Sequence, residues 1–193
     1  MPRQLWYIAP AAAESAPPEA AEVFDAARDL DDVAALYQRH NATVPGATIR
    51  DSAYWRGQLR YAGNPDERFL VARSDGRIAA YARLTTLYEF PFVIEHGGDV
   101  AMLAGLIAHL HGGPQNTRGS LAQLALDGPL RAALAARGLA LRAVDDQSWM
   151  WRPIDVERLA ARLRLPVAAV RAADLFVQLF PLAGSRYWVA DRF

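Results

Sequence analysis

The hydrophobic and polar positions of the central stretch, Phe69 to Gly113, follow strand and then helix periods. Two apolar runs, 69–72 and 78–82, flank Asp75-Gly76, a dipeptide that accepts positive φ and is typical of hairpin turns. A third run, Phe90 to Glu95, is aromatic and β-branched and predicts another strand. The pattern therefore predicts a hairpin that is followed by a third strand.

The same stretch then changes to a helical period. Gly97 and Gly98 predict a turn, and Asp99 stands where the N-cap of a helix would be. The apolar positions after it recur three or four residues apart, as on one face of a helix: Val100, Leu103, Leu106, Ile107 and Leu110. We therefore expect strand, glycine turn and helix in succession.

Weaker patterns extend the prediction toward the N-terminus. They indicate a strand at 5–8, an Ala/Pro-rich linker over 9–21, a strand at 22–26, a helix capped by Asp29 that runs to residue 40, and a helix over 52–61. The first strand has no hairpin partner nearby. It must pair with a distant segment, or with a domain that this chain does not contain.

On the C-terminal side the pattern predicts two more helix–strand units. A strand over 120–126 precedes a helix over 130–137 that ends at Gly138; antiparallel strands at 139–144 and 149–152 follow, then helices over 155–163 and 167–179. The fold class is α/β (α+β), a mixed, mostly antiparallel sheet flanked by helices. We expect a strand and linker over 1–21, a domain over 22–155, and a helical extension over 156–193.

Composition narrows the classes of function. The 193 residues are 52% hydrophobic, enough for a core, and the net charge is zero, so no overall field attracts nucleic acid or anionic lipid. Cysteine and lysine are absent, which excludes disulfides, thiolate nucleophiles and Schiff bases, and suggests a GC-rich bacterial genome. The longest apolar run, Val100 to Leu110, is shorter than the roughly 20 residues of a membrane span. Because Pro10 also interrupts the N-terminal apolar run, we expect a cytoplasmic protein and not an exported one.

The order of elements and one local motif carry a resemblance. Residues 130–155, LRAALAARGLALRAVDDQSWMWRPID, place a helix, a closing glycine, a strand, and then a strand with the pattern W-M-x-R-x-x-D. Over 22–155 the chain resembles the GNAT acetyltransferase superfamily. This resemblance implies an N-acetyltransferase that moves an acetyl group from acetyl-CoA to a small-molecule amine.

A closer resemblance is to tandem-GNAT proteins of the enhanced-intracellular-survival type. By that resemblance, residues 5–8 are the last strand of a first lobe, 22–155 are the second lobe, and Asp191-Arg192-Phe193 are the tail. It implies that the terminal carboxylate of Phe193 acts as a catalytic base on a GNAT lobe supplied by another polypeptide. In the alternative interpretation, the aromatic tail only docks onto the body of the protein. A homo-oligomer is the other expected partner.

The cofactor loop departs from the family pattern. Family members bind the pyrophosphate of acetyl-CoA on a loop of the form R/Q-x-x-G-x-G/A, where backbone amides face the phosphates at a helix N-terminus. The equivalent residues here are Glu95-His96-Gly97-Gly98-Asp99, without the arginine or glutamine. A carboxylate at the helix start would bond to those amides and repel a diphosphate. We therefore predict that this lobe lacks the pyrophosphate motif, and that any acetyl-CoA binding would use these five residues.

Several side chains are candidates for proton transfer. Glu95 and Tyr88 are the strongest, with Tyr7 and Tyr81 behind them, because glutamate and tyrosine both serve as general acids or bases. Each has a simple alternative as a packed or rim residue. Two histidines, 109 and 111, are two positions apart and diverge on a helix, so we expect no metal site.

Three functions remain open at this point. The first is a GNAT-type N-acetyltransferase, acting alone or as part of a larger enzyme. The second is a non-catalytic GNAT-like lobe that shapes a substrate cleft or holds an oligomer together. The third is a small-ligand binding protein that uses the crevice between strand and helix, near His96. The resemblance favours the first, whereas the acidic residues of the cofactor loop favour the second.

Overall fold

The computed structural model describes residues 3–10, 21–42, 47–61, 66–87, 90–112, 116–124, 128–146, 155–162 and 164. These residues form seven strands: β1 Arg3–Ile8, β2 Ala21–Val23, β3 Arg68–Ser74, β4 Arg77–Leu87, β5 Phe90–Gly98, β6 Ser120–Gln123 and β7 Leu141–Asp146. They also form five helices: α1 Ala26–Asn41, α2 Ser52–Tyr61, α3 Val100–His111, α4 Pro129–Ala136 and α5 Val156–Arg162. The predicted α+β fold class is confirmed.

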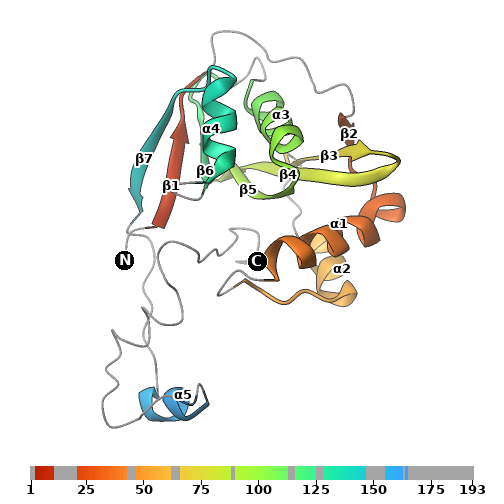
Figure 1. The fold of residues 1–193 in the computed structure, drawn as a ribbon, viewed down its shortest axis with the longest axis vertical. Coiled ribbons are helices and arrows are strands. Elements are labelled where there is room, and N and C mark those ends of the chain that lie inside the picture. The colour runs from red at the N-terminus through yellow and green to blue at the C-terminus, as the bar shows by residue number, and fades with distance from the viewer. Residues whose placement is uncertain are drawn as a thin grey trace.

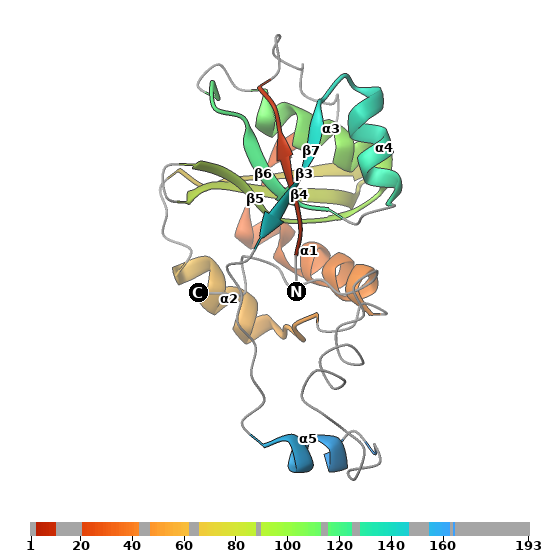
Figure 2. The same ribbon diagram turned by 90° about the vertical axis from the view of Figure 1, so that its left-hand side faces the viewer.

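All seven strands belong to one sheet with the order β2-β3-β4-β5-β6-β1-β7. The pair β5–β6 is parallel, and the other neighbouring strands in this sheet are antiparallel. Helices α1 and α2 cover one face of the sheet, while α3 and α4 cover the other (Figure 1). Helix α5 lies apart from the sheet in both views (Figures 1 and 2).

The N-terminal strand is inserted between two strands that come much later in the chain. β1 lies between β6 and β7 (Figure 2) and is antiparallel to both. Leu5 stands opposite Gln123 of β6 and Val144 of β7. The predicted non-local pairing is therefore confirmed. The expected partner of the strand near 139–144 was 149–152, which lies outside the described residues, whereas β7 is paired with β1.

Two predicted boundaries are wrong. Helix α1 begins at Ala26 and its N-cap is Asp25, whose Oδ1 accepts a bond from the amide of Ala27 at 2.8 Å. The predicted cap, Asp29, lies inside the first turn, where its Oδ2 accepts from the amide of Asp25 at 2.9 Å. Helix α1 therefore starts four positions earlier than a cap at Asp29 predicts, and the preceding strand is limited to Ala21–Val23. The second late helix, 167–179, lies outside the described residues.

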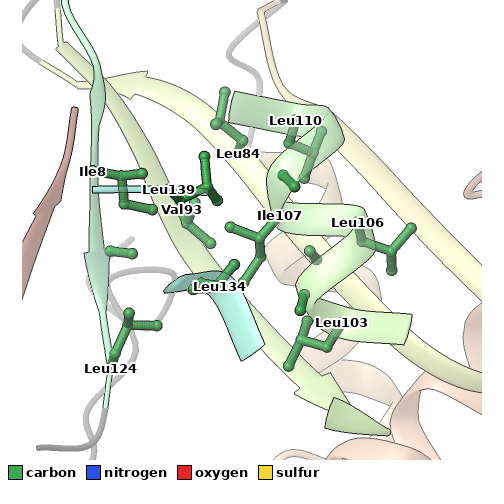
Figure 3. Packing of buried hydrophobic residues seen from close by; sticks show 14 of the residues in the cluster. Ile8, Leu84, Val93, Leu103, Leu106, Ile107, Leu110, Leu124, Leu134 and Leu139 are labelled. Carbon is green, nitrogen blue, oxygen red and sulfur yellow. The ribbon is translucent and has the colours of Figure 1, made fainter. Parts of the chain in front are cut away.

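Each face of the sheet has its own hydrophobic core. Beneath α3 and α4, buried leucines and isoleucines of both helices pack on β1, β4 and β5 (Figure 3). Beneath α1 and α2, the core is more aromatic and includes Tyr37, Trp55, Phe69 and Tyr81. Burying one large apolar side chain stabilises a fold by about 1.5–3 kcal/mol, so both layers hold the sheet from either side. Among the described helices, none has the length and apolar character needed to cross a bilayer.

Candidate functional site

Strands β5 and β6 are paired over a short stretch near the middle of the sheet. Their parallel register covers only two pairs, Phe92 with Leu121 and Val93 with Ala122. Beyond these pairs, the ring of His96 links the two strands, because its Nε2 donates to the carbonyl of Gln123 at 2.9 Å. His96 is buried, so this link lies inside the protein.

A β-bulge redirects the side chains at the end of β5. Arg83 of β4 pairs with Glu95 but Leu84 pairs with Val93, so Ile94 is an extra residue in β5. Ile94 packs in the core under α1 and α2, and Glu95 bonds to Arg50 on that same side. A regular strand would alternate these two side chains between faces. The bulge therefore delivers the Glu95 carboxylate to the α1–α2 side.

The predicted glycine turn at Gly97 and Gly98 is wrong, because both residues belong to β5 and pair with Tyr81 and Ala80 of β4. Gly98 has φ +110, and a Cβ at this position would lie 2.1 Å from the carbonyl oxygen of Ala79. These glycines therefore allow the two backbones to approach closely, and they do not form a loop. Asp99 is the single residue between the strand and α3.

Asp99 is the N-cap of α3, as predicted. Its Oδ1 accepts hydrogen bonds from the amides of Ala101 and Met102, both at 3.0 Å. The amides of a first helical turn have no partner within the helix, and they form the positive end of the helix dipole. The side chain of Asp99 thus occupies two of the donors that an anion would use at this helix end.

Glu95 is fully buried and is bonded through both carboxylate oxygens. Its Oε1 accepts from Arg50 Nη1 at 2.7 Å and from Tyr81 Oη at 2.9 Å, and its Oε2 accepts from Arg83 Nη1 at 2.9 Å. Arg83 donates further to Glu67 at 2.6 Å and to Gln58 at 3.0 Å. We call these six residues the Glu95 cluster: Arg50, Gln58, Glu67, Tyr81, Arg83 and Glu95.

The surroundings of the Glu95 cluster limit what it does chemically. Burial, and then the nearby charge of Glu95, raise the pKa of Tyr81, so this phenol stays protonated and acts as a donor. A general base needs a free lone pair within reach of a substrate proton. Because Glu95 is enclosed and bonded to two guanidinium groups and a phenol, its geometry is that of a structural acceptor.

The predicted site residues do not converge on one point. Glu95 faces the α1–α2 side, His96 faces β6, and Asp99 caps α3 at the surface. Gly97 and Gly98 contribute backbone only. The other two candidates, Tyr88 and Phe193, lie outside the described residues.

Sequence reasoning missed the two arginines that hold Glu95. One signal was available, because Tyr81 and Arg83 are two positions apart in a strand and therefore share a face. An arginine on the apolar face of a strand needs a buried acid as its partner. No comparable local signal exists for Arg50, which is brought to Glu95 from 45 positions away.

His111, at the end of α3, is buried and connects this helix to the residues beside β1 and β6. From the sequence it was a candidate only for metal binding. Its Nε2 donates to the carbonyl of Ala9 at 2.7 Å, and its Nδ1 accepts from Ser120 Oγ at 2.7 Å. Burial lowers its pKa, which keeps the ring neutral. In the described part of the chain, no three His, Cys, Asp or Glu side chains are grouped to hold a metal ion. His111 instead ties α3 to the residue that follows β1.

No family model and no curated protein sequence matches this chain. Among solved structures, it is similar to a conserved protein of unknown function from Enterococcus faecalis V583, "Probable N-Acyltransferase", with 12% identity and a TM-score of 0.51. It is also similar to a "Putative Acetyltransferase from the GNAT family" from Novosphingobium aromaticivorans DSM 12444, with 18% identity and a TM-score of 0.49.

These similarities are similarities of fold. They cover 74% and 75% of this chain, but only 38% and 60% of the two other chains. This chain therefore matches part of a longer protein in each case. The predicted fold, a mixed, mostly antiparallel sheet flanked by helices, is confirmed, and it is similar to that of the Enterococcus faecalis protein.

Proposed function

We propose that this chain is a GNAT-like lobe that does not itself carry acetyl-CoA and that belongs to a larger GNAT-type N-acetyltransferase. In such an enzyme it would form a wall of the substrate cleft or hold the assembly together, while another lobe binds acetyl-CoA and the amine. The observation that carries this proposal is the Asp99 carboxylate bonded to the amides of Ala101 and Met102.

Electrostatics at the β5–α3 junction oppose a diphosphate. Two like charges about 4 Å apart repel by roughly 1 kcal/mol in water and by about 4 kcal/mol at the effective dielectric of a protein surface. A phosphate would also have to displace the cap, whose loss costs a helix about 1 kcal/mol. Both effects act against a ligand that other helix N-termini bind readily.

The contact of His96 with β6 supports the same conclusion. A ligand that inserts between β5 and β6 at this position would first have to move the buried ring of His96 and break its 2.9 Å bond to Gln123. Breaking that bond would leave a buried donor and a buried carbonyl unpaired, which costs about 1–3 kcal/mol for each group. The lobe therefore fills both positions with its own side chains.

Calorimetric titration with acetyl-CoA tests this proposal. We expect no saturable heat with the wild-type protein at millimolar cofactor, and no release of coenzyme A with a panel of primary amines. The variant Asp99→Ala removes the carboxylate from the helix start and should gain measurable, weak binding. Asp32→Ala removes an exposed carboxylate from α1 and serves as the matched control. It should give no saturable heat with acetyl-CoA. Saturable binding to the wild-type protein would overturn the proposal.

A further inference from the structure

We propose that the α1–α2 side of the sheet contains a guanidinium-binding pocket and that Arg50 is its resident ligand. The pocket consists of the rings of Tyr37 and Trp55 and the carboxylate of Glu95. Its ligands are planar cations of the guanidinium class. This inference does not depend on the proposed function, because the pocket and the α3 N-terminus lie on different parts of the lobe.

Aromatic rings form the walls of the pocket. The guanidinium carbon of Arg50 lies 4.2 Å from the ring centroid of Tyr37 and 4.6 Å from that of Trp55. The two rings stand at 88° to each other, with centroids 5.5 Å apart. Two perpendicular aromatic faces attract a cation through their quadrupoles, and most strongly when water is excluded. Both residues are almost fully buried, so water is excluded here.

Charge balance in the Glu95 cluster requires a cation in this pocket. Without Arg50, the cluster holds one cation, Arg83, and two carboxylates, Glu67 and Glu95. Glu95, whose side chain is fully buried, would then share Arg83 with Glu67, and a buried carboxylate without a full counter-charge is unfavourable. The bond from Arg50 Nη1 to Glu95 Oε1 at 2.7 Å supplies that counter-charge.

The pocket residues lie in helices and a strand, whereas Arg50 lies in a connecting segment. Tyr37, Trp55 and Glu95 come from α1, α2 and β5, whereas Arg50 comes from residues 47–51, which form no helix or strand. Its neighbour Ile49 is 95% exposed. Tyr37 Oη donates to the backbone carbonyl of Thr48 in this segment at 2.8 Å, a bond that does not involve the Arg50 side chain. Truncation of Arg50 therefore removes the cation and leaves this backbone contact of the pocket wall in place, so that a free guanidinium compound can replace the side chain.

Replacement of the resident side chain by a soluble one tests the pocket. In Arg50→Ala, ethylguanidinium, which has the end group of arginine, should raise the melting temperature saturably. The expected rise is about 3–6 °C at a tenfold excess over Kd. Sodium chloride at equal ionic strength should not do so. If the variant folds only when ethylguanidinium is present during refolding, that result also supports the pocket.

Two matched variants separate the pocket from general salt effects. The double variant Arg50→Ala/Glu95→Gln lacks the negative charge and should lose the saturable response. Arg56→Ala removes an exposed arginine of the same helix region and should show no ethylguanidinium response. The proposal is overturned if Arg50→Ala shows no saturable response, if it stays unfolded with ethylguanidinium, or if the double variant responds equally.

Discussion

Glu95 and Asp99 are four positions apart in the chain, and each carboxylate is bonded to other groups of the same chain. Glu95 forms ion pairs with two buried arginines, and Asp99 caps α3. In the sequence both are simply acids beside a pair of glycines. Whether a carboxylate is a base, a cap or a structural partner depends on residues far away in the chain. The cap at Asp99 was predictable because its donors are local, whereas the partners of Glu95 were not.

The buried charge of Glu95 should matter more for stability than that of Glu67. Glu95→Gln leaves Arg50 and Arg83 with one carboxylate between them, and breaking a buried ion pair in this way costs about 3–5 kcal/mol. Glu67→Gln removes a carboxylate from Arg83 as well, but that side chain is 13% exposed and water reaches it. Urea unfolding of both variants measures the difference. Equal losses would show that Glu95 is not the centre of the cluster.

His111 should make the stability depend on pH below neutrality. Burial holds its pKa below the usual 6.5, so the folded state binds a proton less readily than the unfolded state. The contribution of neutral His111 to the free energy of unfolding is complete above pH 6.5. It is lost as the pH falls toward the lowered pKa of the folded state. The free energy of unfolding should therefore decrease over this range, by at most about 1.4 kcal/mol per pH unit.

The variant His111→Gln isolates this histidine, since glutamine does not titrate. Urea unfolding at several pH values between 7.5 and 5 should show a smaller slope for the variant than for the wild-type protein. The Arg28 bond holds the pKa of Asp29 below its usual 3.8, so the contribution of Asp29 is lost only at more acid pH. An unchanged slope in the variant would assign the pH dependence to another group.

At the scale of elements, the position of β1 is the feature that connects the ends of the described fold. Its residues Trp6 and Ile8 are buried in the core under α3 and α4. The carbonyl of Ala9 accepts from His111, and the phenol of Tyr7 donates to the carbonyl of Arg118 at 3.0 Å. The position between β6 and β7, which we call the β1 slot, is therefore occupied by β1 through strand pairing and side-chain contacts.

A pair of glycines tests how closely β1 packs in that slot. Gly119 and Gly138 have φ of +78 and +80, so replacement by alanine carries a similar backbone cost of about 1–2 kcal/mol in both. A Cβ on Gly119 would also lie 2.4 Å from the carbonyl oxygen of Ile8, whereas one on Gly138 meets nothing within 4 Å. The free energy of unfolding should therefore fall by at least about 2 kcal/mol more in Gly119→Ala than in Gly138→Ala.

Hydrogen exchange locates that additional loss. In Gly119→Ala, the amides of β1 should exchange faster than those of β3 and β4, because the clash is with β1. If the two alanine variants unfold at the same urea concentration with similar exchange in β1, the close approach of this strand does not contribute to stability.

For the molecule as a whole, local periodicity predicted the types of the elements and their order. Apolar residues recur every three or four positions on a helix face and every second position on a strand face, so the spacing distinguishes the two. Strand pairing was harder, since the partners of β1 are more than 100 positions away and no local pattern indicates them. The bulge at Ile94 could not be predicted either, because it depends on the pairing register between β4 and β5. The expected helix cap at Asp99 is therefore present, whereas the expected glycine turn before it is part of β5.

If Asp99 excludes a diphosphate from the N-terminus of α3, as proposed, this helix end should not respond to acetyl-CoA. The most direct measurement is a nitrogen–proton correlation spectrum of the wild-type protein, recorded during titration with acetyl-CoA to millimolar concentration. We predict that the amide signals of Ala101 and Met102 do not shift, because both protons are already bonded to Asp99. Saturable shifts of these two signals would contradict the account and would show that the helix N-terminus holds the phosphates.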